Sequence, residues 1–386
     1  MHRRKQKIFI TEPEGMCTVL RLQMHKIKLA LESTGASIVD NSSNADISVI
    51  GTCSAFKADE ARTIKKITDN KSEKPLYAYG CMCTVNPDEL NADKLFSSWD
   101  AASLVKDVTG VDIDNFDDII LPGEFKNKDE YRIFDPSKKF LGITFGCSFD
   151  CTYCPHKLGV GCAFSYSPEG ILKRIKEYNS DESIKTIYLT GTDTACYNYN
   201  GKSFAYLLKE ILKISRKDIE YRISQFNPEG LFTDKEYLTN QLQDERVTEL
   251  QTPIQTVNSD LLTLMKRYYK ACDVADVIAD IKTKNPNIYL KTDIMIGFPN
   301  ETLEDVVESV NFCLEHFAEI AIYKFELLNN APIYKMNLPQ IDSKEKEKRY
   351  QYALQKIESH GLNVHSGGQK LNTLISSDRK KEAGAK

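Results

Sequence analysis

Three cysteines stand close together in the segment TFGCSFDCTYCPH, residues 144–156, with the spacing C-x3-C-x2-C. They are Cys147, Cys151 and Cys154. A structural zinc ion takes four ligands, so zinc would need Cys151 and Cys154 together with His156 or Cys162. A [4Fe–4S] cluster also takes four ligands, and three cysteines in a short loop leave one iron open. Because free structural cysteines do not usually gather in a glycine-flanked loop, the spacing favours a cluster over buried core cysteines.

A second set of cysteines is spread along the first part of the chain. Cys17, Cys53 and Cys81 are 36 and 28 positions apart, and each follows a segment with strand character. In a parallel sheet the carboxyl ends of neighbouring strands meet at one edge, which is where ligands bind. Cys83 lies two residues after Cys81 and is the alternative third member of this set.

The elements that must position these cysteines form two α/β series. Strand patterns at 7–12, 36–54 and 74–83 alternate with helical patterns at 17–35 and 55–70, which predicts a small doubly wound parallel sheet. A second series starts at 138–147 and continues with strands at 184–193, 218–226, 246–255, 287–298 and 319–328. Six βα units predict a partial (β/α)6 barrel similar to a TIM barrel, with the clustered cysteines after its first strand.

The domain boundaries follow from composition. The acidic, irregular segment 116–136 predicts a linker, and the last 21 residues are polar and charged. We therefore expect an N-terminal domain over 1–130, a second domain over 137–365 and a polar tail over 366–386.

The overall composition is that of a globular protein, with 41% hydrophobic and 27% charged residues. There is no apolar run of 18 residues, and the basic start MHRRKQKIFI lacks the apolar region of a signal peptide. We expect a cytoplasmic protein with no membrane partner. The net charge of −4 argues against a strongly basic surface for nucleic acid.

The motif with Tyr153 before its last cysteine resembles the signature of the radical S-adenosylmethionine (SAM) superfamily. This resemblance implies that the open iron binds the amino and carboxylate groups of SAM. An electron from the cluster then cleaves SAM, and the resulting 5′-deoxyadenosyl radical takes hydrogen from an unactivated C–H bond. The chemistry belongs to the cofactor, and the protein supplies orientation and excludes water.

Further motifs resemble the methylthiotransferases of this superfamily. The cysteines of GTCS and YGCM match the family's N-terminal pattern, and the segments RISQFNPEG, LQTPIQTVNSDLLTLMKRYY and TDIMIGFPNETLEDV match its central motifs in order. The resemblance runs from about residue 7 to 362. It implies that Cys17, Cys53 and Cys81 hold a second [4Fe–4S] cluster, whose open iron carries the sulfur that is transferred.

Candidate SAM-binding residues follow the strands of the second domain. The segment TGTD offers acceptors for an ammonium group, and Arg222 on a strand is suited to pairing a carboxylate. An ordinary ion pair would explain Arg222 equally well, and a helix cap would explain Asp193. No catalytic side chain is expected. Cys196, Cys272 and Cys313 match no motif and are expected to be small core residues. The candidate contacts are Thr190, Gly191, Asp193, Arg222, Ser224 and Gln255.

Two departures from the family concern the substrate. The family's RGxxRSR pattern is replaced by GVGCAFSYSPEG, and the family's C-terminal TRAM domain does not fit into the final polar residues. We expect a peptide or protein substrate. The alternatives are an N6-modified tRNA adenosine, which would stack on Phe164 or Tyr166, and an enzyme whose N-terminal cluster only transfers electrons. The family implies an electron donor such as flavodoxin or ferredoxin.

Overall fold

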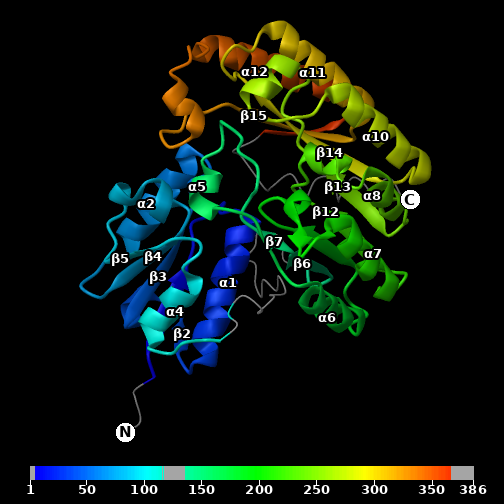
Figure 1. The fold of residues 1–386 in the computed structure, drawn as a ribbon. Coiled ribbons are helices and arrows are strands. Elements are labelled where there is room, and N and C mark those ends of the chain that lie inside the picture. The colour runs from blue at the N-terminus through cyan, green and yellow to red at the C-terminus, as the bar shows by residue number, and fades with distance from the viewer. Residues whose placement is uncertain (1–4, 115, 117–134, 367–386) are drawn as a thin grey trace.

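The computed structural model describes residues 5–114, 116 and 135–366 of the chain, which form two parallel-sheet units (Figure 1). The first unit has a five-stranded sheet in the order β2-β1-β3-β4-β5, and every pair in it is parallel. This confirms the predicted N-terminal parallel sheet. Its strands are β1 (Lys7–Thr11), β2 (Ser37–Val39), β3 (Ile47–Thr52), β4 (Leu76–Gly80) and β5 (Lys94–Phe96).

The helices of this unit are α1 (Thr18–Ser33), α2 (Lys57–Asn70), α3 (Met82–Val85) and α4 (Ala101–Thr109). Helix α1 buries Leu20, Met24, Ile27 and Leu31, which recur every three or four residues and therefore share one face. It ends at Ser33, two residues before Gly35, where φ is +89°. Glycine adopts this left-handed conformation without strain, which explains why the helix ends close to the predicted position, Gly35.

The second unit is a seven-stranded parallel sheet in the order β16-β15-β14-β13-β12-β9-β6. The first six of its strands along the chain are those of the predicted partial barrel, and β16 is an additional edge strand after the last helix. The strands are β6 (Lys138–Gly142), β9 (Thr186–Thr190), β12 (Glu220–Ile223), β13 (Val247–Gln251), β14 (Tyr289–Ile296), β15 (Glu319–Lys324) and β16 (Asn363–Ser366).

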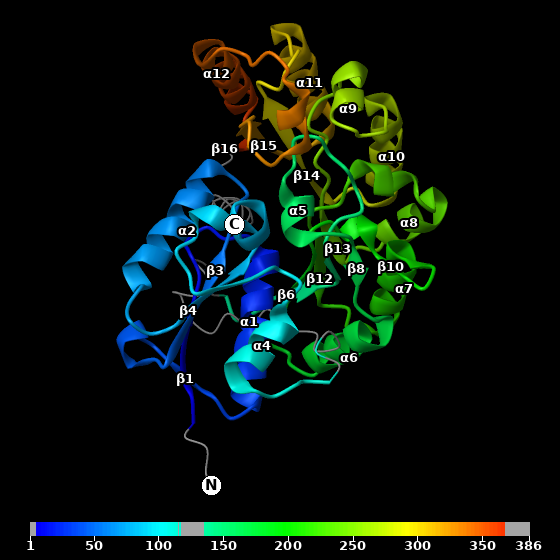
Figure 2. The ribbon, with the colours of Figure 1, turned by 60° about the vertical axis from the view of Figure 1, so that its left-hand side comes forward.

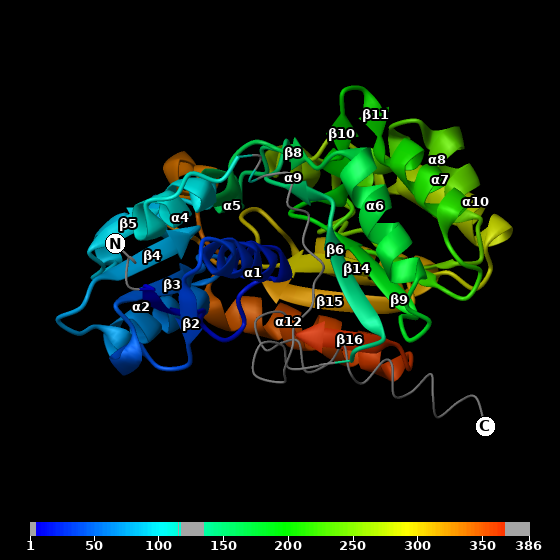
Figure 3. The same ribbon diagram turned by 90° about the horizontal axis from the view of Figure 1, so that it is seen from below.

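Helices cover the outside of this sheet, and one extended apolar core fills the space between them (Figure 3). A short hairpin, β7 (Thr144–Phe145) with β8 (Phe164–Ser165), encloses the cysteine loop and the small helix α5 (His156–Val160). A second hairpin pairs β10 (Asn198–Tyr199) with β11 (Lys202–Ser203). The covering helices are α6 (Pro168–Asn179), α7 (Phe204–Ile214), α8 (Lys235–Leu242), α9 (Ser259–Leu264), α10 (Ala271–Lys284), α11 (Leu303–His316) and α12 (Ser343–Ser359).

The two units pack directly on one another, with α1 at their boundary (Figures 1 and 2). Gln23 of α1 donates a hydrogen bond of 3.0 Å to the hydroxyl of Tyr166. On the opposite side of the barrel, Phe56 stacks on Tyr323 of β15 with ring centroids 6.0 Å apart. The first unit therefore contacts the second at two places, the segment after β8 and the strand β15.

Most of the predicted linker and nearly all of the predicted tail lie outside the described residues. Within the described ranges, none of the helices has the length and apolar character needed to cross a bilayer.

Candidate active site

The cysteine loop follows β6 and is fixed by backbone hydrogen bonds to neighbouring loops. The amide of Gly146 donates to the hydroxyl of Thr192 at 3.1 Å, and the amide of Thr152 donates to the carbonyl of Met265 at 3.1 Å. The amide of Cys147 donates to the carbonyl of Gly161 at 3.0 Å, which closes the loop on itself. These hydrogen bonds fix the shape of the loop backbone.

The thiols of this loop are suited to a metal that ionises them. Burial raises the pKa of the Cys154 thiol, although the backbone amides of His156 and Lys157 act on its sulfur in the opposite direction. Burial also raises the pKa of Cys151, against the charge of Arg267. Because bound iron holds cysteine as the thiolate, these buried thiols fit an iron–sulfur cluster.

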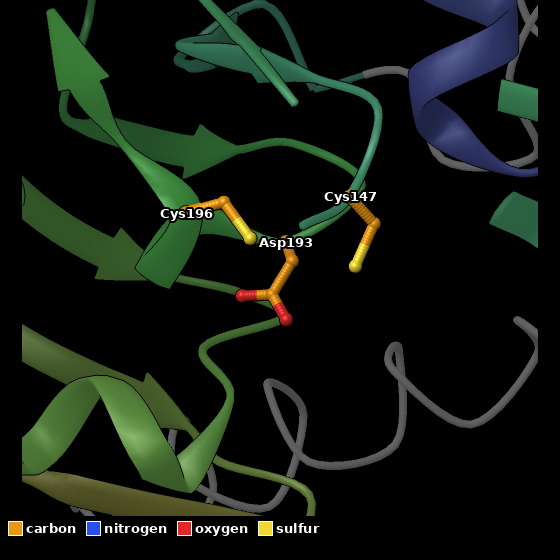
Figure 4. Close-up of side chains that lie close together, drawn as sticks. All are labelled: Cys147, Asp193 and Cys196. Atoms are coloured by element: carbon orange, nitrogen blue, oxygen red, sulfur yellow. The ribbon is translucent and has the colours of Figure 1, made fainter. Parts of the chain in front are cut away.

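The residues that zinc would need as ligands do not lie close together. Ligand atoms of one tetrahedral zinc ion lie roughly 4 Å apart, given zinc–sulfur bonds of about 2.3 Å. Among the described residues, the one group of three ligand atoms within 4.8 Å of one another is that of Cys147, Asp193 and Cys196 (Figure 4). Cys151 and Cys154 with His156 or Cys162 do not form such a group. The ligand set that zinc would need is therefore not gathered at one point in the described part of the chain.

The close-up corrects one expectation about the remaining cysteines. Cys196 is a neighbour of the motif and not a core residue: its sulfur accepts a hydrogen bond from the amide of Ser148 at 3.4 Å, and its side chain points toward Cys147 (Figure 4). Cys272 is also not a core residue, because it is exposed. Cys313 is fully buried, as predicted.

Four of the candidate SAM contacts gather at the carboxyl ends of β9 and β12. Ser224 donates from its hydroxyl to that of Thr190 at 3.0 Å. Gly191 lies so near Thr144 that a Cβ there would be 1.9 Å from the Thr144 hydroxyl, so only glycine fits. The fourth, Asp193, accepts hydrogen bonds from the amides of Ala195 (3.0 Å) and Asn227 (3.2 Å).

Asp193 and Arg222 have structural partners of their own. Asp193 caps the 3-10 turn Thr194–Cys196, and burial raises its pKa to about 7. Arg222 donates to the hydroxyl of Tyr188 at 2.9 Å and lies 3.9 Å from a carboxylate oxygen of Glu249. The cap and the ion pair that were open alternatives are therefore both present.

Gln255 follows β13 and has φ of +63°, a conformation that side-chain-bearing residues rarely adopt. Its amide donates to the carbonyl of Asp293 at 2.8 Å, and its carbonyl accepts from Met295 at 2.9 Å. These bonds to β14 fix the loop at the same edge of the sheet as Thr190 and Ser224.

The second cysteine set assembles at the carboxyl edge of the N-terminal sheet. Cys53 follows β3, Cys81 follows β4, and Cys17 precedes α1, whose first amides, Val19 and Leu20, act on its sulfur. Burial, and then the neighbouring thiolates of Cys53 and Cys17, raise the pKa of Cys81 well above its ordinary value. Cys53 and Cys81 belong to the same apolar cluster of the N-terminal unit.

Cys83 lies outside the apolar cluster that contains Cys53 and Cys81. Its sulfur lies 3.6 Å from the hydroxyl of Thr52 and belongs to a separate apolar cluster behind β3 and β4. Of the two thiols, Cys81 is therefore the one that shares a cluster with Cys53.

Helix α5 joins the two cysteine sites. It begins two residues after Cys154, and its Gly159 packs on Cys81: a Cβ added to Gly159 would be 2.8 Å from the Cys81 Cβ and 3.2 Å from its sulfur. The hydroxyl of Ser98 also donates a hydrogen bond to the carbonyl of Gly159. One short helix therefore connects the two cysteine sites, and at Gly159 it leaves no space for a side chain.

One residue of the site was not singled out from the sequence. Arg267 belongs to the segment LMKRYY, and its guanidinium reaches the sulfur of Cys151 at 3.7 Å. The motif that contains this arginine was recognised, but nothing in the pattern shows that the side chain turns inward.

Comparisons with known proteins agree with this geometry. The radical SAM superfamily model matches residues 141–313, and that of Uncharacterized protein family UPF0004 matches residues 15–98. A probable threonylcarbamoyladenosine tRNA methylthiotransferase of Pyrococcus horikoshii is 28% identical over 289 residues, 72% of this chain and 67% of that protein. Ribosomal protein uS12 methylthiotransferase RimO of Clostridium botulinum is 29% identical over 377 residues, 91% and 82% of the two chains.

The fold also has a solved counterpart. The structure of the radical S-adenosylmethionine methyltransferase TsrM from Kitasatospora setae matches with a TM-score of 0.64 at 11% identity, over 86% of this chain and 77% of that one. The protein described here has the fold and the cysteine motif of radical SAM enzymes. It is similar to methylthiotransferases over most of its length.

Proposed function

We propose that this transferase inserts a methylthio group at an unactivated C–H bond of a macromolecular substrate. In this proposal Cys147, Cys151 and Cys154 hold the radical SAM cluster, and the set Cys17, Cys53 and Cys81 holds the auxiliary cluster. The observation that carries it is the contact of Gly159 with Cys81, which brings the auxiliary site against the helix that follows the radical SAM motif. Sulfur and radical chemistry must meet at one carbon, so the two sites have to be neighbours.

The bound cofactors supply hydrogen abstraction from carbon and a methylated sulfur, and the chain's residues supply position and exclusion of water. Thr190, Ser224 and Gln255 place polar atoms at the edge of the sheet beside the cysteine loop. Phe298 is fully buried and meets Tyr153 edge-on, with ring centroids 6.4 Å apart. These rings form an apolar wall next to Cys154.

For the substrate we propose a peptide or protein side chain. The segment between α5 and α6 carries an apolar surface where the family pattern has arginines: Phe164 is 40% exposed, and it meets Tyr166 edge-on at 5.2 Å. Tyr166 itself is buried against α1 and so belongs to the core. An apolar, uncharged rim is better suited to a peptide than to a phosphate backbone, which is bound through Lys and Arg.

A tRNA adenosine is the second candidate, because the Pyrococcus horikoshii relative is named for threonylcarbamoyladenosine in tRNA. The test incubates the reconstituted protein anaerobically with SAM and a reductant. The two probes are ribosomal protein uS12 and tRNA that contains N6-threonylcarbamoyladenosine. Mass spectrometry follows the probe, and chromatography follows S-adenosylhomocysteine and 5′-deoxyadenosine.

The proposal expects both SAM products, with one methylthio group in place of hydrogen on the protein probe. Modification of the tRNA probe, with binding that weakens steeply with salt, would replace the peptide assignment by the RNA one. 5′-Deoxyadenosine without S-adenosylhomocysteine would overturn methylthio transfer and favour an auxiliary cluster that only transfers electrons.

A further inference from the structure

Arg267 is a buried cation in the wall of the radical SAM site. It lies three residues beyond the end of α9, and only 4% of its surface is exposed. Its guanidinium donates to the carbonyl of Pro253 at 2.6 Å and to the hydroxyl of Tyr153 at 3.2 Å. It also reaches the side-chain oxygen of Asn227 at 3.4 Å and the hydroxyl of Tyr269 at 3.3 Å. Every one of these partners is neutral.

No carboxylate lies within 4 Å of this guanidinium in the part of the chain that the structure describes. Two other buried cations of the protein are paired with carboxylates: Lys291 lies 3.0 Å from Glu249, and Arg349 lies 3.2 Å from Glu301. The charge of Arg267 acts on the carboxyl groups of Asp193 and Asp293 only from beyond contact distance. A buried charge without a counter-charge in contact is destabilising, so an anion next to the guanidinium would complete the site. Among the partners named above, the Cys151 sulfur, 3.7 Å from Nη1, is the one that binding of iron would turn into an anion.

We propose that Arg267 is the built-in counter-ion of the radical SAM cluster and that it raises the cluster's reduction potential. A Cys151 thiolate bound to iron would accept a charge-assisted hydrogen bond from the guanidinium, which already lies 3.7 Å from the sulfur. Reduction of the cluster by one electron would add a further negative charge beside Arg267. A fixed positive charge in a site of low dielectric stabilises the reduced form more than the oxidised form.

Arg267 is therefore a positioning residue: it acts through Cys151 and also fixes Tyr153, two residues further along the loop. This inference rests on the assignment of the cluster to Cys147, Cys151 and Cys154, but not on the identity of the substrate or on methylthio transfer.

The experiment is a redox titration of the full chain with both clusters loaded, followed by electron paramagnetic resonance. The signal that changes when SAM is added belongs to the radical SAM cluster, and the other cluster serves as an internal control. Three variants are compared with the wild type. Arg267→Met removes the charge at similar length, Arg267→Lys keeps the charge but loses the forked donors, and Arg349→Met is the matched control, a buried arginine paired with Glu301.

We expect Arg267→Met to lower the ratio of reduced to oxidised SAM-responsive cluster at least tenfold at a fixed potential, which corresponds to about 59 mV. Arg267→Lys should fall between this variant and the wild type, and Arg349→Met should leave both potentials unchanged. Loss of about four irons per chain in Arg267→Met alone, with retention in Arg267→Lys, would also support a counter-ion role.

The proposal is overturned if Arg267→Met keeps both clusters at wild-type potentials. It is equally overturned if Arg267→Met and Arg267→Lys lose the cluster or lower its potential to the same degree, since the charge would then be irrelevant. Either result leaves the proposed function intact, because that function is tested by its products.

Discussion

Gly159→Ala tests whether the two cysteine sites are held together as the structure shows. The added Cβ would lie 2.8 Å from the Cβ and 3.1 Å from the Cα of Cys81. Carbon atoms pack best at about 3.5–4.0 Å, so the methyl group is too close to a backbone that cannot rotate away. Overpacking of this kind costs about 1–3 kcal/mol, whereas alanine in a helix gains about 1 kcal/mol over glycine. We expect a net loss of about 1 kcal/mol.

The assay uses Trp99, the single tryptophan of the chain. Its ring lies against Gly161, just after α5, and meets Phe145 edge-on with centroids 5.6 Å apart. Its fluorescence during urea denaturation therefore reports separation of the N-terminal unit from the cysteine loop. Gly159→Val should be destabilised further than Gly159→Ala, because it adds more atoms and loses part of the gain in helix propensity.

The matched control is Gly142→Ala, whose new Cβ would meet only the Leu22 Cδ1 at 3.4 Å, an ordinary contact. The order of stability should be wild type and Gly142→Ala, then Gly159→Ala, then Gly159→Val, and the iron bound by the auxiliary site should fall in the same order. A Gly159→Ala protein that is more stable than the wild type and binds full iron would refute the close contact, since helix propensity alone would then decide.

Three further predictions concern single side chains. Burial raises the pKa of Asp293 to about 6, so the native state binds its proton more tightly than the unfolded chain does. The free energy of unfolding should therefore fall by about 3 kcal/mol as the pH rises from about 4 to about 6. Asp293→Asn should remove this pH dependence, measured by urea denaturation at each pH. Lys291 lies 3.0 Å from Glu249 and 3.4 Å from Glu319. Lys291→Met should cost about 3–5 kcal/mol at neutral pH by calorimetry, and a loss below about 1 kcal/mol would show that the pairs are not formed. Cys196→Ala should retain about eight irons per chain and Cys147→Ala about four, because we assign Cys147 as a ligand of the radical SAM cluster. Loss of iron in Cys196→Ala but not in Cys147→Ala would show that Cys196 is the ligand instead.

The sheets were predictable because their strands alternate regularly with amphipathic helices. The segments that became β9, β14 and β15 are bounded by glycine or by helix caps, and the carboxyl ends of parallel strands meet at one edge. The strand β16 was not predicted. It is only four residues long, follows a polar helix, and exists because it pairs with β15 from Glu319 to Ile322.

The site was predictable in its cysteines but not in its charges. The choice between Cys81 and Cys83 depends on which thiol faces the neighbouring strand ends, which spacing alone does not decide. Arg222 resembled a carboxylate-binding residue, yet it already has Tyr188 and Glu249 as partners. Arg267 is buried among neutral groups that come from distant parts of the chain, and only the fold brings them together.

The most direct test of the two-cluster account is the iron and acid-labile sulfide content of the reconstituted protein. It compares the wild type with the triple variants Cys17→Ala/Cys53→Ala/Cys81→Ala and Cys147→Ala/Cys151→Ala/Cys154→Ala. The account predicts about eight irons in the wild type and about four in each variant. About four irons in the wild type, unchanged in the first variant, would contradict it and leave a single-cluster enzyme.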